Sequence, residues 1–159
     1  MDAPVIPVRV RLKSALSTPV TASENVTVKL TLAPDGSTIK EVWRNKQFDS
    51  YMGGFVKLGD WLYGCGVAKP GFLSLNAKTG EIGKELKIGT GSVIAADGML
   101  YYYNHRGEVM LINADPLTMD VLSKFRITRG LKEHFAHPVI HDGKLYVRHG
   151  NWLQAFKIT

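Results

Sequence analysis

Short runs of apolar residues, separated by glycine, aspartate and asparagine, recur along this 159-residue chain. One frame occurs three times: an apolar run, a Gly/Asp pair, and a Leu-Tyr pair that opens a second apolar run. Its three copies span residues 54–63, 92–101 and 137–146. The pairs Asp97-Gly98 and Asp142-Gly143 suit a two-residue turn that needs positive φ at both central positions. The frame therefore predicts a β-hairpin, whose valine, isoleucine, leucine and tyrosine side chains suit strands buried on both faces.

Further strands are predicted after each hairpin: two after the first and the second, and one after the last. The predicted third strands are residues 72–76, 109–113 and 153–156, and the predicted fourth strands are residues 85–88 and 121–127. The Leu-Tyr pairs begin at positions 62, 100 and 145, so the repeats are 38 and then 45 residues apart. That spacing is typical of one four-stranded blade of a β-propeller. No segment has a convincing helical pattern, so the predicted fold class is all-β, with blades of four antiparallel strands.

We predict a single domain of propeller blades over residues 1–159, with about three to four blades. Its predicted parts are an N-terminal strand within 1–17, a degenerate blade over 18–50, blades over 51–90 and 91–130, and a blade over 131–159 that lacks its fourth strand. Residues 5–12 alternate apolar and polar side chains and are predicted to complete the ring or an edge. So few blades are at the lower limit of a closed propeller, and we expect a partial propeller. Its unpaired blade edges favour self-association as a dimer.

Charge and composition change this picture little. The chain carries 20 Lys and Arg against 14 Asp and Glu, a formal charge of +6, and its basic residues are scattered. Outward-facing Lys and Arg on strands give such a count and also deter edge-to-edge aggregation, so nucleic-acid binding is a weaker alternative. No long apolar window predicts a membrane span, and residues 1–7 lack the pattern of a signal peptide. The single Cys65 excludes an internal disulfide, and we expect it to be a small buried residue.

Two segments carry a resemblance to a known family. They are residues 75–81, Leu-Asn-Ala-Lys-Thr-Gly-Glu after a predicted strand, and the hairpin at 138–147. Over roughly residues 18 to 159 the chain resembles the pyrroloquinoline-quinone-dehydrogenase-like β-propellers, a superfamily that includes the β-propeller lipoprotein of bacterial outer-membrane assembly. It is similar to the C-terminal half of secreted bacterial proteins of the dehydrogenase-like type, whose rings have about eight blades. The resemblance implies a periplasmic or extracellular location.

The resemblance also implies what a quinone enzyme of this family needs. Such enzymes hold pyrroloquinoline quinone on the ring axis with a Ca²⁺ ion bound by acidic and amide side chains, a catalytic Asp and commonly two adjacent cysteines. This sequence has one cysteine, and no cluster of Asp, Glu and Asn indicates a Ca²⁺ site. We therefore expect no cofactor, and pyrroloquinoline quinone with Ca²⁺ enters only through the resemblance.

Histidines are the first candidates for chemistry in the last predicted blade. His137 and His141 share one face of a strand but lie about 13 Å apart, too far to bind one ion, so no metal site is predicted. First strands line the central channel of a propeller, so residues near their entry are predicted to face a ligand there. The predicted ligand-binding residues are Glu133, His134, His137, Arg148 and His149. The competing interpretation is that these are surface loop residues, with a histidine bonded to backbone.

Catalytic residues are not identified by any motif. The sequence has no Gly-x-Ser-x-Gly elbow and no phosphate-binding loop with its lysine. Its predicted function is that of a non-catalytic β-propeller module, which binds a protein, peptide or glycan through its loops and edge strands. The first alternative is a fragment or homologue of a pyrroloquinoline-quinone-dependent dehydrogenase, and the second is a nucleic-acid-binding protein.

Overall fold

The computed structural model describes residues 26–50, 54–67 and 69–158, and the thirteen elements in this part of the chain are all β-strands. They form four antiparallel sheets of two, four, four and three strands, in which strands consecutive in sequence are neighbours. The predicted fold class, all-β with four-stranded antiparallel blades, is confirmed. The predicted N-terminal strand at 5–12 lies outside the described residues.

The four sheets are named blades 1 to 4 in chain order. Blade 1 consists of β1 (Thr27–Leu32) and β2 (Ile39–Asn45). Blade 2 consists of β3 (Phe55–Leu58), β4 (Trp61–Gly66), β5 (Gly71–Asn76) and β6 (Ile82–Leu86). Blade 3 consists of β7 (Gly91–Ala96), β8 (Met99–Asn104), β9 (Glu108–Asn113) and β10 (Val121–Arg126). Blade 4 consists of β11 (Val139–His141), β12 (Lys144–His149) and β13 (Trp152–Lys157).

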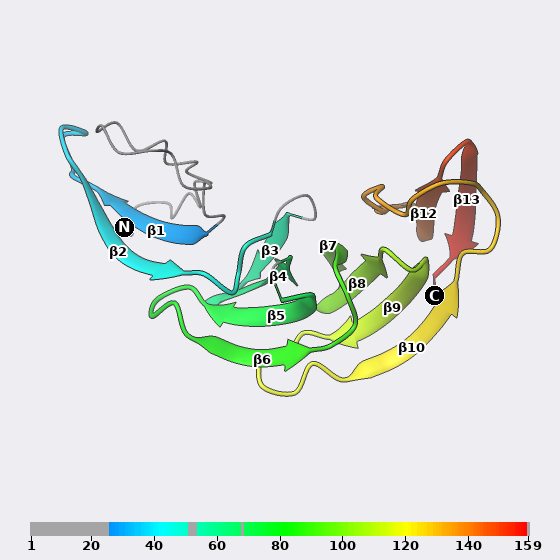
Figure 1. Cartoon of the computed structure of the whole chain (residues 1–159), viewed down its shortest axis with the longest axis horizontal. Coiled ribbons are helices and arrows are strands. Elements are labelled where there is room, and N and C mark those ends of the chain that lie inside the picture. Colours follow the sequence, from blue (N-terminus) through cyan, green and yellow to red (C-terminus); the bar gives the residue numbers. More distant parts are fainter. Residues whose placement is uncertain (1–25, 51–53, 68, 159) are drawn as a thin grey trace, which may run out of the picture.

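The blades follow one another along an open arc, with blade 1 at one end and blade 4 at the other (Figure 1). The first strands β3 and β7 lie toward the concave side of the arc, and the fourth strands β6 and β10 lie on its convex side (Figure 1). Blades 2 and 3 each lie between two other blades, whereas blades 1 and 4 are terminal. This arrangement is that of a partial propeller, as the sequence predicts.

The hairpin turns follow from their residues. Asp97 and Gly98 have φ angles of 51° and 72°, and Asp142 and Gly143 have φ angles of 47° and 65°. Positive φ at both central residues is the signature of the turn whose twist matches that of paired strands. In the first copy of the frame only Gly59 of the two turn residues has positive φ, at 56°, so the reversed Gly-Asp order gives a different turn.

Apolar side chains are buried mainly between neighbouring blades, in three clusters. The cluster between blades 1 and 2 contains Phe48, the cluster between blades 2 and 3 contains Phe72 and Tyr102, and the cluster between blades 3 and 4 contains Tyr103 and Leu145. The rings of Phe72 and Tyr102 lie 4.4 Å apart across their junction. The core of this protein is therefore a series of blade-to-blade junctions, each closed by side chains from two sheets.

The Leu-Tyr pair of the repeated frame supplies both junctions of a blade. Leu62 packs toward blade 1 and Tyr63 toward blade 3. In blade 3, Leu100 packs toward blade 2 and Tyr101 toward blade 4. Successive side chains of a strand point to opposite faces, which is why one dipeptide serves two neighbours. The same alternation turns Tyr146 of blade 4 away from blade 3.

The fourth strand of blade 2 differs from its prediction. The sequence predicts residues 85–88, and the strand spans Ile82–Leu86. The preceding turn is tight, because the N–H of Asn76 donates to the carbonyl of Glu81 and the N–H of Gly80 donates to the carbonyl of Asn76. Pairing with β5 therefore begins immediately after this turn, earlier than the apolar pattern indicates.

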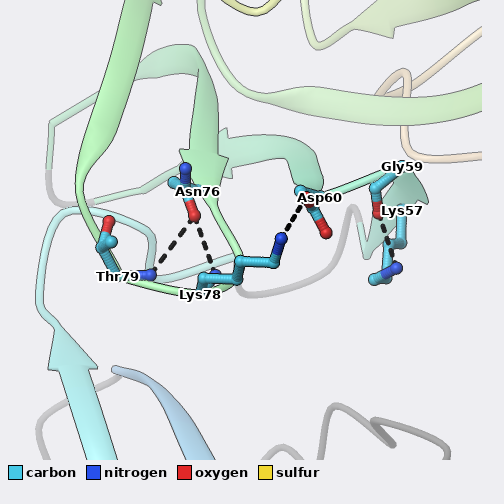
Figure 2. A network of polar contacts seen from close by, with 6 residues as sticks. All are labelled: Lys57, Gly59, Asp60, Asn76, Lys78 and Thr79. Carbon is cyan, nitrogen blue, oxygen red and sulfur yellow. Dashed lines mark hydrogen bonds and ion pairs between the residues drawn. The ribbon is translucent and has the colours of Figure 1, made fainter. Parts of the chain in front are cut away.

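Polar contacts order the turns at this end of blade 2 (Figure 2). The side-chain oxygen of Asn76 accepts the backbone N–H groups of Lys78 and Thr79, at 2.8 and 3.3 Å. The Lys78 ammonium lies 2.6 Å from the Asp60 carboxylate in the neighbouring hairpin turn, and this hydrogen bond lowers the pKa of Asp60 (Figure 2). Because both charged groups are exposed, the pair organises the two turns and contributes little to stability.

Candidate functional site

The antiparallel strand order places two kinds of loop at the same end of each blade, here called the connecting end. One is the connection from a fourth strand to the next blade, and the other is the turn between the second and third strands. In blade 4 these are residues 127–138 and the turn at 150–151. The five predicted ligand-binding residues all lie on the first of these loops or at the end of β12.

The structure brings two of the five predicted residues into direct contact. The imidazole rings of His134 and His149 stack, with centroids 3.7 Å apart and an interplanar angle of 20°. His134 comes from the connection between blades 3 and 4, and His149 ends β12. The stack therefore joins a loop to the strand that this loop precedes.

The other three predicted residues take other positions. Glu133 is exposed. Arg148 points Nε at the carbonyl oxygen of Gly150, 2.9 Å away. His137 lies near the start of blade 2, where a Cβ on Gly54 would be 3.8 Å from its Cε1. Their predicted role as ligand-binding residues stays a prediction.

Both ring nitrogens of His149 face backbone carbonyls. Nδ1 lies 3.0 Å from the carbonyl oxygen of Arg129, and Nε2 lies 2.6 Å from that of Lys132. A carbonyl oxygen only accepts hydrogen bonds, so both contacts are hydrogen bonds when both ring nitrogens carry protons. The residue is 6% exposed. It therefore anchors the connection between blades 3 and 4 from the inside.

His134 links the stack to blade 3. Its Nδ1 is hydrogen-bonded to the hydroxyl of Tyr103, and the two rings meet edge to face with centroids 5.5 Å apart. Burial lowers the pKa of His134, and the nearby charges of His149, Arg126 and His105 lower this pKa further. Burial raises the pKa of Tyr103 to about 12. At neutral pH this contact therefore joins a neutral imidazole to a neutral phenol.

Two glycines make room for the stacked rings. A Cβ on Gly107 would lie 2.7 Å from Cε1 and from Nε2 of His134, and a Cβ on Gly130 would lie 2.6 Å from Nδ1 of His149. Both glycines have positive φ, 82° and 110°, which other residues rarely adopt. Any side chain at either position would displace a histidine, so these glycines belong to the site. No pattern in the sequence distinguishes these two glycines from the others.

A comparable contact occurs in two other blades. In blade 3, Nδ1 of His105 lies 3.1 Å from the carbonyl oxygen of Thr90. In blade 2, the Asp49 carboxylate accepts the backbone N–H of Val67. Each contact joins a connection between blades to the turn or strand end beside it, as His149 does. The recurrence of this contact favours the interpretation in which His149 is bonded to the backbone and has a structural role.

Large side chains on the same loop and at the start of β13 are exposed. We call them the rim surface, which consists of Arg129, Leu131, Phe135 and Trp152. Leu131, Phe135 and Trp152 are 72%, 55% and 44% exposed. The Arg129 guanidinium carbon lies 5.3 Å from the centre of the Trp152 ring, within the range of a cation–π contact.

Trp61 and Trp152 could each be an exposed anchor for a partner, but the sequence favours packing between blades for both. A tryptophan beside a turn between apolar strands predicts packing between blades, and Trp61 does pack against the cluster between blades 2 and 3. Trp152 instead lies at the edge of its blade beside Arg129. The position of Arg129 depends on the path of the loop between blades, and no local pattern in the sequence reports that path.

Metal-ligating side chains and the single cysteine were the remaining candidates for chemistry in the described residues. In the ranges covered by the structure, no group of three His, Cys, Asp or Glu side chains could hold a metal ion. Cys65 is buried, as expected, and its thiol lies 3.2 Å from the carbonyl oxygen of Gly91.

An open groove of about 540 Å³ lies beside β9 and β10. Its lining includes Lys87, Arg106 and Lys124, one acidic residue, Glu108, and several apolar side chains. A surface that follows a nucleic-acid backbone needs a continuous row of basic side chains. This mixed lining gives the nucleic-acid alternative little support.

The blades, their order and their junctions define a β-propeller-like protein. No family model matches the sequence, and a comparison with curated proteins finds no match. Thirty-nine chains of solved structures match. One of them is BamB from Moraxella catarrhalis, which superimposes with a TM-score of 0.60 at 14% sequence identity. The match covers 85% of this chain and 40% of the BamB chain, so this chain spans well under half of that protein's length.

The likeness to BamB is a likeness of fold. It supports the interpretation of the arc as part of a β-propeller, and it does not distinguish between functions. Among the described residues, no helix is long and apolar enough to cross a membrane.

Proposed function

We propose that this chain is a non-catalytic β-propeller module that binds a protein or peptide through the rim surface. The observation that carries the proposal is a contrast at the connecting end of blade 4. There the rings of His134 and His149 turn inward, to Tyr103 and to backbone carbonyls, while the rim surface turns outward. The two imidazoles, which are the groups best suited to proton transfer, are in contact with other groups of the protein. The apolar side chains of the rim surface, which are suited to contact a partner, are exposed.

The chemistry of the rim surface suits a protein partner. Tryptophan and arginine are the residue types that most often carry the binding energy of protein interfaces. Trp152 offers a partly exposed ring, and Arg129 lies over it with a charged group that can bond a carboxylate or a carbonyl. Leu131 and Phe135 add exposed apolar area on the same loop. A partner with an apolar side chain next to an acidic group fits this combination.

The likeness to BamB supports a scaffold role and a periplasmic location. BamB is a β-propeller lipoprotein of outer-membrane assembly. A propeller presents loops on a rigid frame, which is a common way to build a binding surface. The partners of BamB are not carried over to this chain, because the match spans 40% of BamB. A glycan ligand, which the sequence also allows, would stack on the ring of Trp152.

A displayed library of random peptides tests the proposal directly. The wild-type chain should enrich a set of related peptides with an apolar residue next to an acidic one. Trp152→Ala should lose that enrichment, and Arg129→Ala should reduce it. Leu122→Ala is the matched control, since Leu122 is also exposed, at 52%, but lies on β10 of blade 3. Equal enrichment by all four proteins, or no enrichment by the wild type, would contradict the proposal.

Titration with ligands separates the alternatives. We expect no saturable binding of pyrroloquinoline quinone in the presence of Ca²⁺, and saturable binding would favour the dehydrogenase alternative. We also expect no affinity for DNA or RNA at low salt, where electrostatic attraction to phosphates is strongest. Strong binding to DNA or RNA would favour the nucleic-acid alternative.

A further inference from the structure

The open groove beside β9 and β10 is formed by two blades. Lys87 and Ile88 follow β6 of blade 2, whereas Arg106, Met110 and Lys124 belong to blade 3. The fourth strands β6 and β10 are on the convex side of the arc (Figure 1). The residues that line the groove are separate from the rim surface. Its volume of about 540 Å³ is within the range of ligand sites, so the groove is a second surface at which a ligand can bind.

Positive charge is unbalanced in this groove. Its lining contains three cationic side chains, Lys87, Arg106 and Lys124, and one carboxylate, Glu108. That carboxylate is already engaged, since its Oε2 accepts a hydrogen bond from Nδ2 of Asn104 at 2.8 Å. In the part of the chain that the structure describes, no carboxylate forms an ion pair with any of the three cations. The groove is therefore suited to an anionic ligand.

The strand β10 adds backbone groups to this surface. It is the edge strand of blade 3, because the order of strands in this sheet is β10-β9-β8-β7. The N–H of Ile127 donates to the carbonyl of Gly107, and residue pairs along an antiparallel ladder alternate between hydrogen-bonded and non-hydrogen-bonded. Counting back from this pair, Lys124 and Arg126 belong to non-hydrogen-bonded pairs. Their N–H and C=O groups therefore point away from β9, toward the open edge.

The edge is regular beside the groove. The register shift between β10 and β9 falls between Val121 and Ser123, so residues 123–126 pair with β9 without interruption. All six residues of β10 are exposed. A bulge or a covering loop would hinder the pairing of an edge strand with another chain, and neither occurs over residues 123–126 among the described parts of the protein.

We propose that the groove and the edge of β10 bind an acidic, extended segment of another protein. The segment pairs its backbone with Lys124 and Arg126 and adds a fifth strand to blade 3. Side chains at every second position of that segment then lie on the same side of the sheet as the Lys124 side chain, which lines the groove. Carboxylates at these positions meet the three cations. The partner is therefore a strand with an acidic residue at every second position.

Other occupants satisfy fewer of these groups. A small anion contacts the cations but leaves the outward N–H and C=O groups of Lys124 and Arg126 to water. A nucleic acid requires a longer row of basic side chains than the three in this groove. A second copy of β10 would bring Lys124 and Arg126 against the same cations, and like charges on paired strands are unfavourable. An acidic strand satisfies both the cations and the backbone.

This site goes beyond the proposed function, because it is separate from the rim surface and selects a different sequence. The rim surface requires an apolar side chain next to an acidic one, and the groove requires acidic side chains at alternate positions. A peptide that alternates glutamate with threonine distinguishes the two sites, since it offers the rim surface no apolar side chain. The predicted dimer through unpaired blade edges stays a prediction, and charge disfavours β10 as its interface.

Fluorescence anisotropy with a labelled peptide of alternating glutamate and threonine, about eight residues long, tests the site. Threonine favours a strand, so the probe is suited to pair with β10. The wild type should bind this probe saturably, and added salt should weaken the binding. A control peptide has the same composition, with its glutamates and threonines in two blocks. It should bind about fivefold more weakly, because half of its carboxylates would point away from the groove.

Variants of the protein locate the binding. Lys124→Glu should weaken binding by about tenfold or more, because it replaces attraction by repulsion. Lys157→Glu makes the same change of charge at an exposed residue of β13 and is the matched control. Lys124→Pro should bind more weakly than Lys124→Ala, because only the proline also removes the outward N–H. Since β9 does not use that N–H, circular dichroism should show the same fold for all four variants. Lys87→Glu, which lies outside the strands, should weaken binding without any change in β10.

Specific outcomes would overturn the inference. They are a wild type that does not bind the alternating peptide, equal binding of the two peptides, or equal effects of Lys124→Glu and Lys157→Glu. The last two results would indicate a general attraction between opposite charges. Trp152→Ala should bind the alternating peptide as the wild type does, and a loss would assign that peptide to the rim surface instead. Trp152-dependent enrichment of apolar–acidic peptides without binding of the alternating peptide would remove the groove site and leave the proposed function. Binding of the alternating peptide without that enrichment would do the reverse.

Discussion

The junction between blades 2 and 3 and the face of blade 4 that is turned away from blade 3 place side chains at the same positions of the same repeat, yet they differ in what covers them. Phe72 is fully buried against Tyr102, and the corresponding Leu153 is 68% exposed. The backbone register is the same at both positions, since each residue pairs with the second residue after the tyrosine of its frame. Repeat position therefore sets the direction of a side chain, and the number of neighbouring blades sets its burial.

The largest effect that separates these two regions should come from truncating each side chain. Phe72→Ala should lower the free energy of unfolding by about 3–5 kcal/mol, because it leaves a cavity in a closed junction. Leu153→Ala should change it by no more than about 0.5 kcal/mol in the monomer, since exposed positions contribute little. Urea unfolding at a protein concentration where the chain is monomeric measures both values.

The same pair of variants can break the comparison. If Leu153→Ala costs as much as Phe72→Ala, another part of the chain covers the outer face of blade 4, and burial does not separate the two regions.

A smaller effect is expected on the other face of blade 4, where His149 ties the connection to β12. His149→Ala removes the contacts of both ring nitrogens with carbonyl oxygens and the stack with His134, and it should destabilise the protein by about 2 kcal/mol. His141→Ala, which changes an exposed histidine of the same blade, is the control and should be neutral. Equal stability of the two variants in thermal unfolding would show that the histidine stack does not hold the blade.

The smallest effect should be a change in pH dependence. The pKa of His134 in the folded chain lies below its ordinary value, so the unfolded chain binds a proton at this residue more readily than the folded chain. The contribution of His134 to stability is therefore complete above the unfolded pKa, decreases as the pH falls from about 6.5 to the folded pKa, and is constant below it.

Replacing the imidazole by an amide measures this contribution. His134→Gln should flatten the decrease in unfolding free energy between about pH 7.5 and about pH 5, compared with the wild type. The other four histidines are kept, so the difference between the two profiles reports on His134 together with its electrostatic interaction with His149 and His105. Parallel profiles would contradict the assignment of a lowered pKa to this residue.

Much of the fold is predictable from the sequence because it depends on residues that are close in the chain. Asp97-Gly98 and Asp142-Gly143 predict their turns through the φ angles that these pairs tolerate, and both turns are found. The apolar runs on either side predict strands, because each run can bury both faces between two blades. The fourth strand of blade 2 begins earlier than predicted, because the tight turn that ends at Glu81 decides where pairing starts.

The candidate site is less predictable. Five residues of one loop and one strand are predicted to bind a ligand, but nothing in their spacing indicates that His134 and His149 stack, or that Tyr103 of another blade bonds the stack. Trp152 has a local pattern similar to that of Trp61, yet it lies at the rim with Arg129. Contacts of this kind join the loop between two blades to strands on either side of it, and they depend on the path of that loop and on how the blades stack.

By itself, the sequence determines the repeat, the turns and the side of the sheet on which each side chain lies. These follow from period-two alternation and from φ preferences, which act over a few residues. The tertiary structure alone decides that the same positions are buried in blades 2 and 3 and exposed on blade 4. Burial requires a second sheet at the right distance, and in a repeat protein each unit obtains that sheet from its neighbour.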